Sequence, residues 1–285
     1  MKVNKFNEAP ETNRVILNWS GGASSAVACF LASQVYGNTH CAFCDTHLEH
    51  PDTYRFMKDF EKRTGIKVHV YSSTAFHEPE EVWRRYNGLN FAHGAPCSTD
   101  LKREVRVKQI QNVDLDYGQV FGFDASDREQ RRAKNMTKNY PEINPIYPLI
   151  ERGFTKPDVI RYLKHDLGLE PPVVYEHFQN NNCIGDYDSP KGGCVQGGVG
   201  YWQKIKTIFP KKYDYMAKIE HELSKKKGEP VTICKDQRKD SKGERLFLKH
   251  CDDFPDIKTI DVIEGKQPEG LFECHGFCGT LEDYL

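Results

Sequence analysis

One short stretch of the chain has the residue types that bind a phosphate group. The sequence SGGASS, residues 20–25, follows an apolar run and precedes a helical pattern. Glycines let the backbone approach a ligand closely, serine hydroxyls donate hydrogen bonds, and the amides at a helix N-terminus favour negative charge. The same residues would also make a good turn between a strand and a helix. The candidate phosphate ligands are Ser20, Gly21, Gly22, Ser24 and Ser25.

Cysteines form the second group of residues with possible chemistry, and the chain has ten of them. Cys183 and Cys194 lie in a glycine-rich segment, and Cys274 and Cys278 form a second pair. Four cysteines in two pairs suit a [4Fe-4S] cluster or a structural zinc ion. Unrelated thiols are the third interpretation, and we favour the cluster.

The other cysteines that we examined call for simpler explanations. Cys41 and Cys44 form a C-x2-C pair, but they lie in a predicted strand, where residues three apart face opposite sides. Cys29 falls in an apolar helical pattern and is expected to be a buried small side chain. Cys97 lies in the polar segment PCSTDLK and is a candidate pocket residue.

Short apolar runs alternate with helical patterns along the first part of the chain. Strands are predicted at RVILNW, THCAFCD, KVHVYS and GQVFGF, with helices between them. This alternation is typical of βαβ units, and it predicts an α/β fold with a doubly wound parallel sheet. Such sheets bind ligands beyond the carboxyl ends of their strands, where SGGASS would lie.

The pattern changes after the helix predicted within TKPDVIRYLKHDLGL. Residues 171–200 are rich in proline, glycine and asparagine, one or two helices follow, and the last residues are irregular. We therefore expect a nucleotide-binding α/β domain over residues 1–168. A C-terminal helical and irregular extension with the late cysteines is expected over residues 169–285.

Composition and charge narrow the classes of function. With 285 residues, 38% hydrophobic, 28% charged and a net charge of -1, the chain has an ordinary globular composition without an overall bias toward polyanions. Its polar N-terminus and the absence of a long apolar window predict a cytoplasmic protein without a membrane segment. Residues 201–250 hold 14 lysines and arginines against 7 acidic residues, which suits either a solvated helix or nucleic-acid phosphates.

Five segments in a fixed order resemble one known family. SGGASS lacks the GxGxxG and GxxxxGK[ST] fingerprints, but it resembles the SGGx[DT]S loop of the PP-loop ATP pyrophosphatase superfamily. The downstream segments are similar to motifs of its phosphoadenosine phosphosulfate (PAPS) reductase-like branch, and the resemblance covers roughly residues 14–210. These segments are CDTHLEHPDTYRF, PCSTDLK, GFDASDREQRR and YPLIERGFTKPDVIRYLKHDLGLEPPVVYEH.

The resemblance implies the fold of adenine nucleotide alpha hydrolase-like proteins and a role for each matched segment. It implies that the SGGASS residues hold nucleotide phosphates and that the backbone near Phe43 reads adenine. Lys102 would neutralise phosphate or sulfate charge, and Arg131 or Arg132 would clamp a phosphate, with exposed helix positions as the simpler explanation for each. Asp45 would hold Mg²⁺ or a ribose hydroxyl, unless it caps the following helix. Gly122 begins the matched turn GFDASDREQRR.

The sequence also departs from the family pattern. Ser24 stands where Asp or Thr is usual, His47 where Gly is usual, Asp124 where Arg is common, and Asp127 where Glu is common. Members of the branch commonly carry NCxGC, so DYDSPKGG resembles an insertion between Cys183 and Cys194.

Three functions follow from the resemblance. In the first, ATP is cleaved between the α and β phosphates, pyrophosphate leaves on the loop, and an adenylylated acceptor receives sulfur or another nucleophile. In the second, a cysteine thiolate attacks the sulfur of an adenylyl sulfate, and sulfite is released. ECHGFC only approximates the ECG[LI]H nucleophile segment of the reductases, so we favour ATP cleavage. The third is a nucleotide- or nucleic-acid-binding module without catalysis.

Overall fold

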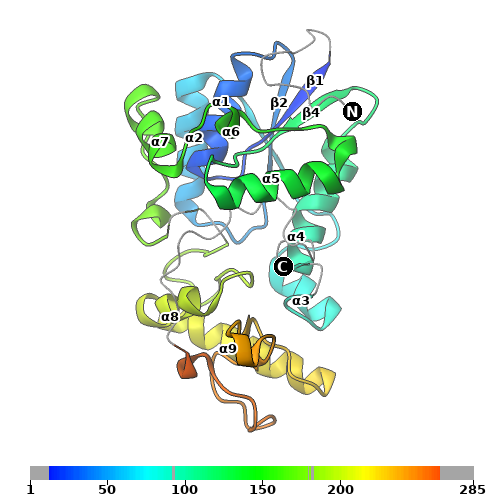
Figure 1. Ribbon diagram of the computed structural model, residues 1–285, viewed down its shortest axis with the longest axis vertical. Coiled ribbons are helices and arrows are strands. Elements are labelled where there is room, and N and C mark those ends of the chain that lie inside the picture. Colours follow the sequence, from blue (N-terminus) through cyan, green and yellow to red (C-terminus); the bar gives the residue numbers. More distant parts are fainter. Residues whose placement is uncertain (1–12, 92–93, 179, 181–182, 264–285) are drawn as a thin grey trace.

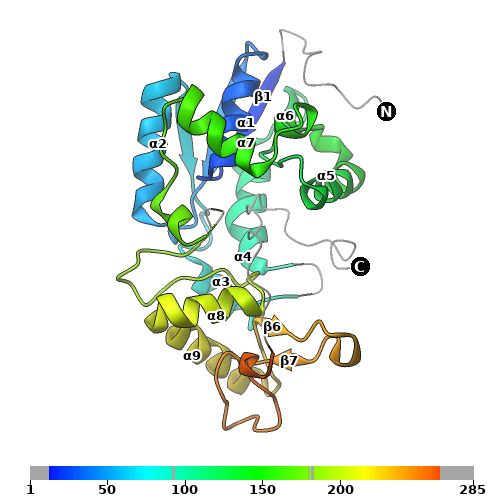
Figure 2. The same cartoon turned by 60° about the vertical axis from the view of Figure 1, so that its left-hand side comes forward.

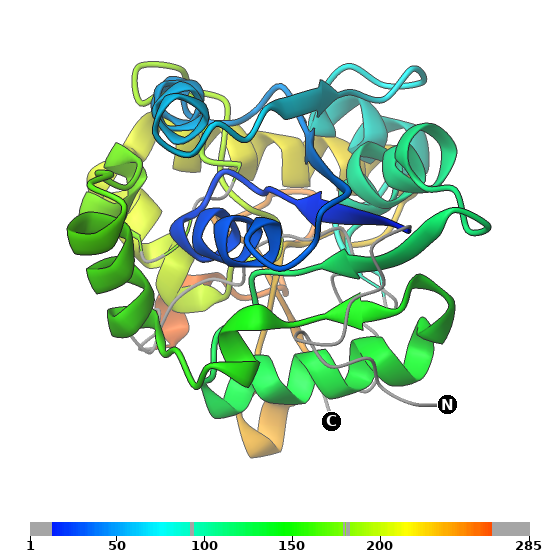
Figure 3. The same ribbon diagram turned by 90° about the horizontal axis from the view of Figure 1, so that it is seen from above.

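A computed structural model describes residues 13–91, 94–178, 180 and 183–263. Its centre is a sheet of parallel strands in the order β3-β2-β1-β4-β5. Figure 1 shows this sheet in the upper part of the molecule, and Figure 3 shows it from above. The strands are β1 (Arg14–Asn18), β2 (Thr39–Cys44), β3 (Val68–Tyr71), β4 (Asp116–Val120) and β5 (Pro145–Ile146).

The order of the strands reverses beside β1. The chain moves outward from β1 to β2 and β3, and then returns to place β4 on the other side of β1. This reversal makes a topological switch point beyond the carboxyl ends of β1 and β4, which is where open α/β sheets bind ligands. SGGASS begins two residues after β1, so it lies at this point.

Helices cover both faces of the sheet because successive strand residues point to opposite sides. Val15 and Leu17 of β1 belong to the main core with helices α1, α2 and α7, whereas Ile16 packs on the other face with Ile110. The helices that accompany the sheet are α1 (Ala23–Ser33), α2 (Pro51–Thr64), α3 (Pro79–Tyr86), α4 (Pro96–Ser98), α5 (Asp127–Asn139), α6 (Pro148–Glu151) and α7 (Lys156–Arg161).

Several helical segments depart from regular α-helix geometry. α4 continues into π-helical turns at Thr99–Arg103 and Arg106–Ile110, and α7 continues into another at Tyr162–Asp166. The sequence predicted a helix over the first of these regions but not its wider turns, because a π turn leaves no distinct periodicity. Short 3-10 helices lie at Pro141–Ile143, Val173–Glu176, Lys239–Ser241 and Ile260–Val262.

A second hydrophobic core lies beside the carboxyl edge of the sheet. It is built mainly around α8 (Val199–Ile208) and α9 (Pro210–Lys227), with the short strands β6 (Cys234–Lys235) and β7 (Arg245–Leu246) nearby (Figure 2). Trp83, Leu89 and Ala95 also belong to this core, although they precede β4 in the sequence. The expected boundary at residue 168 stays a prediction, and the second core uses residues from both sides of it.

The α/β fold class with a parallel sheet is confirmed, as are the helices and strands predicted around SGGASS. Cys29 is fully buried in the main core, as expected. Over the described part of the chain, no helix has both the length and the apolar character needed to span a bilayer.

Candidate functional site

The loop after β1 is folded by its own serine hydroxyls. The Ser25 hydroxyl oxygen accepts from the Ser20 amide and from the Ser20 hydroxyl, both at 3.0 Å, and Ser25 donates to the Gly22 carbonyl at 2.9 Å. Gly21 has φ 83°, a left-handed conformation that favours glycine. Helix α1 begins directly afterwards without a side-chain cap, so its first amides face the region beyond the strand end.

Gly122, after β4, packs against this loop from the neighbouring strand. A Cβ atom at Gly122 would lie 2.6 Å from the Ser25 amide nitrogen and 2.7 Å from the Ser25 Cα. Such distances are too short for any side chain, so the close approach of the two backbones requires glycine. The structure therefore brings Gly122 together with the predicted phosphate loop.

Two residues that the sequence analysis missed also reach the loop. Lys156 Nζ donates to the Ser24 hydroxyl oxygen at 2.9 Å, and the Ala23 amide donates to the Tyr175 hydroxyl at 2.8 Å. Lys156 is the first residue of α7. A lysine in the first turn of a helix opposes the helix dipole, and this unfavourable placement was the one sequence signal for a special role.

Asp45, just after β2, is buried and holds its neighbours in place. Its two carboxylate oxygens accept from the Tyr54 hydroxyl at 3.0 and 2.9 Å, and one of them accepts from the His47 amide at 2.8 Å. Burial and the nearby Asp45 raise the pKa of Tyr54 well above its ordinary range, so this hydroxyl keeps its proton. Asp45 does not cap α2, because His50 does so through its ring nitrogen.

His47 explains one departure from the family pattern. It has φ 56°, in the left-handed region where glycine is favoured and where the family usually has glycine. Its ring stacks on His77 with the ring centroids 4.4 Å apart. The loop thus keeps the backbone conformation of the motif while presenting an exposed imidazole.

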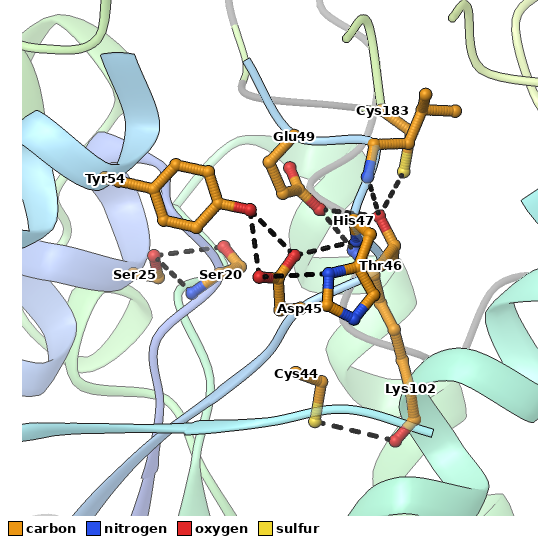
Figure 4. A network of polar contacts seen from close by, with 11 residues as sticks. Ser20, Ser25, Cys44, Asp45, Thr46, His47, Glu49, Tyr54, Lys102 and Cys183 are labelled. Carbon is orange, nitrogen blue, oxygen red and sulfur yellow. Dashed lines mark hydrogen bonds and ion pairs between the residues drawn. The ribbon is translucent and has the colours of Figure 1, made fainter. Parts of the chain in front are cut away.

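A buried chain of polar contacts joins Lys102 to Cys183 (Figure 4). Lys102 Nζ lies 3.8 Å from Glu49 Oε1, and the Thr46 hydroxyl donates to the same oxygen at 3.1 Å. The Thr46 hydroxyl is also 3.5 Å from Cys183 Sγ. The side chains of Lys102 and Glu49 are 8% and 1% exposed, so Lys102 is not the solvated helix lysine of the simpler explanation.

Other predicted residues lie apart from these contacts. Phe43 is buried with its ring edge against Trp19, so its side chain belongs to the core. Arg131 is exposed on α5, and within the described part of the chain no polar contact joins it to the loop. Its neighbour Arg132 pairs with Glu129 at 2.9 Å and lies over the Phe123 ring.

Cys183 and Cys194 flank a loop that closes on itself. The Gly193 amide donates to the Cys183 carbonyl at 2.9 Å, and the Cys194 amide donates to the Tyr201 hydroxyl at 3.1 Å. Burial raises the pKa of Tyr201 far above its ordinary value, and both thiols add to this effect. Lys212 fixes the loop between the two cysteines through contacts with its backbone.

Lys212 of α9 is fully buried and points its ammonium at the backbone of this loop. Its Nζ donates to three carbonyl oxygens, at 2.6 Å for Asp186 and 2.7 Å for Ser189 and Lys191. Burial lowers the pKa of Lys212 to about 8. The segment DYDSPKGG is therefore an ordered element built around one buried cation.

The predicted four-cysteine site is only partly within the described residues. Cys274 and Cys278 lie outside them. Among residues 13–91, 94–178, 180 and 183–263, no group of three or more His, Cys, Asp or Glu side chains is arranged to hold a metal ion. Cys41 is buried in the main core and Cys44 donates to the Lys102 carbonyl, so the C-x2-C pair forms no site.

Many basic side chains of residues 201–250 pair with carboxylates. The described pairs are Lys206–Asp261, Lys218–Glu222, Lys227–Glu229, Arg238–Asp236 and Lys249–Asp214. These pairs reduce the positive charge that a nucleic acid would meet, although binding to this region stays a prediction.

Comparison with known proteins places the chain in a family. Two curated phosphoadenosine 5'-phosphosulfate reductases are similar to it: that of Alkalilimnicola ehrlichii is 26% identical over 55% of this chain and 64% of the relative, and that of Alteromonas mediterranea is 24% identical over 58% and 66%. The match thus spans just under two thirds of each relative's length. The solved U34-tRNA thiolase NcsA from Methanococcus maripaludis, with its [4Fe-4S] cluster, aligns over 90% of this chain and 85% of its own, with 15% identity and a TM-score of 0.39.

The motifs quoted above and the loop geometry fall within one continuous match. Residues 14–191 match the phosphoadenosine phosphosulfate reductase domain, and this range includes SGGASS, Asp45, Lys102 and Gly122. The chain therefore belongs to the phosphoadenosine phosphosulfate reductase domain family.

Proposed function

We propose that the chain binds ATP at the carboxyl edge of its sheet and cleaves it between the α and β phosphates. The observation that carries this proposal is the Ser20–Ser25 loop, folded on its own hydroxyls at the N-terminus of α1. A nucleophilic acceptor attacks the α phosphorus, the bond to the bridging oxygen breaks, and pyrophosphate leaves on the loop. The product is an adenylylated acceptor, ready for displacement by sulfur or another nucleophile.

Lys102 and Asp45 have different proposed roles at the sheet edge. Lys102 lies at the end of the buried Glu49 contact, where its ammonium can stabilise negative charge on the departing phosphates. Asp45 supports the loop after β2, since both its oxygens already accept hydrogen bonds. It is therefore a poor fit for direct Mg²⁺ coordination, and Mg²⁺ would arrive with the nucleotide phosphates.

We also propose that Cys183 and Cys194 contribute two ligands to a [4Fe-4S] cluster, with zinc as the alternative. Thiols held by a closed loop fit this donor chemistry, and the remaining ligands would be Cys274 and Cys278. When bound, the cluster would supply iron able to hold a sulfur atom or exchange electrons. Anaerobically purified protein should absorb broadly near about 400 nm and contain iron, whereas iron-free, colourless protein would contradict the cluster.

Reduction of an adenylyl sulfate is the second candidate. The position of Cys183 Sγ beside Thr46 favours it, because a thiol then lies at the same sheet edge as the phosphate loop. A cysteine thiolate would attack the sulfur, the nucleotide phosphate would leave, and a second thiol would release sulfite as a disulfide forms. ATP cleavage remains our first choice.

The decisive experiment incubates the protein with Mg-ATP and, separately, with adenylyl sulfate and its 3′-phosphorylated form. Pyrophosphate and AMP from ATP would support the first function, and sulfite would support the second. Nucleotide binding without either product would support a binding module. Ser25→Ala should reduce pyrophosphate release because it opens the loop, whereas Ser33→Ala, at the far end of α1, should leave it unchanged.

A further inference from the structure

Lys156 joins the candidate phosphate loop to a distant part of the chain. Its ammonium donates to the Ser24 hydroxyl oxygen at 2.9 Å, across 132 positions of sequence. Ser24 is 1% exposed and occupies the position where the related loops usually have Asp or Thr. The departure from the motif and the contact with lysine therefore occur at the same residue.

Two further side chains hold the ammonium in this place. Lys156 Nζ donates to the Asn180 side-chain oxygen at 2.9 Å and lies 3.5 Å from the Tyr175 hydroxyl. It also lies 5.3 Å from the centroid of the Tyr175 ring. Because the Tyr175 hydroxyl accepts from the Ala23 amide, the lysine, the tyrosine and the loop form one connected cluster.

The charges of this cluster favour an anion. The amides at the start of α1 carry partial positive charge, and the Lys156 ammonium adds a full positive charge beside the same loop. Where related loops have Asp or Thr, this loop has Ser24, whose hydroxyl contacts the ammonium. A polyphosphate would be drawn to both the ammonium and the helix amides.

We propose that Lys156 is a phosphate-binding residue that contacts the pyrophosphate portion of a nucleoside triphosphate, with Tyr175 and Asn180 as its positioning residues. The proposal rests on the proposed nucleotide site and adds a residue and a selectivity to it. The ammonium supplies positive charge beside the position where related loops have Asp or Thr. Binding should therefore favour ligands with linked phosphates over adenosine.

Equilibrium binding of ATP, inorganic pyrophosphate and adenosine to the full chain tests this proposal. Lys156→Met should weaken ATP and pyrophosphate binding about 10- to 100-fold, the usual range for a charge-assisted hydrogen bond, and leave adenosine binding unchanged. Lys156→Arg should restore much of the ATP affinity. Lys164→Met removes the same charge from the turn after α7, where Lys164 pairs with Glu170, and should bind all three ligands normally.

A salt titration separates a charge contact from a structural tether. ATP affinity of the unaltered protein should fall more steeply with sodium chloride than that of Lys156→Met, because only the former keeps the ion contact. Thermal unfolding checks that each variant is folded, and Lys156→Gln provides a second neutral variant. Unchanged ATP affinity and salt dependence in the neutral variants would overturn the role of Lys156 alone. Absence of ATP, pyrophosphate and adenosine binding in the unaltered protein would overturn the proposed function as well.

Discussion

The thiol of Cys183 lies 3.5 Å from the hydroxyl of Thr46, so the segment that begins at Cys183 contacts the loop that follows β2. Thr46 also donates to Glu49, and Glu49 lies beside Lys102. The position of the Cys183 thiol is therefore linked, through the buried side chains of Thr46 and Glu49, to Lys102, the cation proposed to face the phosphates. A substitution at Thr46 should therefore affect both the Cys183 thiol and the Glu49–Lys102 contact.

Replacing Thr46 with valine keeps the shape of the side chain but removes its hydroxyl. Glu49 loses a donor in a buried place, so we expect the free energy of unfolding to fall by about 1–3 kcal/mol. Cys183 loses its tether and should react faster with iodoacetamide, as followed by peptide mass spectrometry. Thr46→Ser keeps the hydroxyl and should react at the original rate. An unchanged rate in Thr46→Val would show that the contact does not restrain the thiol.

Gly122→Ala should damage the proposed phosphate loop without removing a polar side chain. The added Cβ would lie 2.6 Å from the Ser25 amide nitrogen, so the loop must shift. We expect weaker ATP binding and a loss of about 1–3 kcal/mol of stability, as in other overpacked sites. Gly37→Ala is the matched control, because its Cβ would meet nothing within 4 Å. Equal effects of the two substitutions on ATP affinity would contradict this account.

Lys212→Met should loosen the loop between Cys183 and Cys194. Three carbonyl oxygens lose their donor, and the loop backbone loses the buried group around which it folds. Faster hydrogen exchange of the loop amides, measured by mass spectrometry, is the expected result. Lys211→Met changes the exposed neighbour on the same helix and should leave the exchange as it was. Protection that persists in Lys212→Met would rule out this role.

Glu220 of α9 should make stability depend on pH. Burial raises the pKa of Glu220 from 4.5 to about 8, in spite of the amides of Ile233 and Leu248 that donate to it. Between these pH values the folded state holds a proton that the unfolded state has lost. Its contribution to the free energy of unfolding is thus fully present below pH 4.5 and is lost as pH rises toward 8, by at most about 1.4 kcal/mol per pH unit.

Chemical denaturation between about pH 5 and pH 8 measures this effect. Glu220→Gln removes the titrating group. The free energy of unfolding of the unaltered protein, minus that of this variant, should therefore fall as the pH rises. Glu222→Gln, a partly exposed position on the same helix, should keep the original slope. A slope that survives in Glu220→Gln would assign the pH dependence to other groups.

The strand and helix around SGGASS could be predicted from the sequence because each depends on residues that are close together in the chain. Apolar runs of strand length, the glycines of SGGASS and the helical pattern after them agree with β1 and α1. The ordered motifs also pointed to Gly122, which packs against the backbone of SGGASS. Motif matching identifies backbone positions well, because glycine conformation and helix starts depend on near neighbours.

The partners of individual side chains could not be predicted in the same way. The contact between Lys156 and Ser24 spans 132 positions, and no periodicity encodes it. Asp45 looked like a ligand or a cap, but its oxygens are occupied by Tyr54 and the His47 amide. A carboxylate at a strand end has several possible donors, and only the folded chain selects among them.

The second hydrophobic core determines whether fragments of this chain can fold separately. Trp83, Leu89 and Ala95 pack with residues that follow residue 170, up to Ile260. A fragment ending at residue 168 would expose these apolar side chains to water, and a fragment beginning at 169 would lack three members of its own core. During synthesis, the first of these residues emerges long before its last partner. The two halves of the sequence are thus interlocked in space, and the chain should be expressed and studied whole.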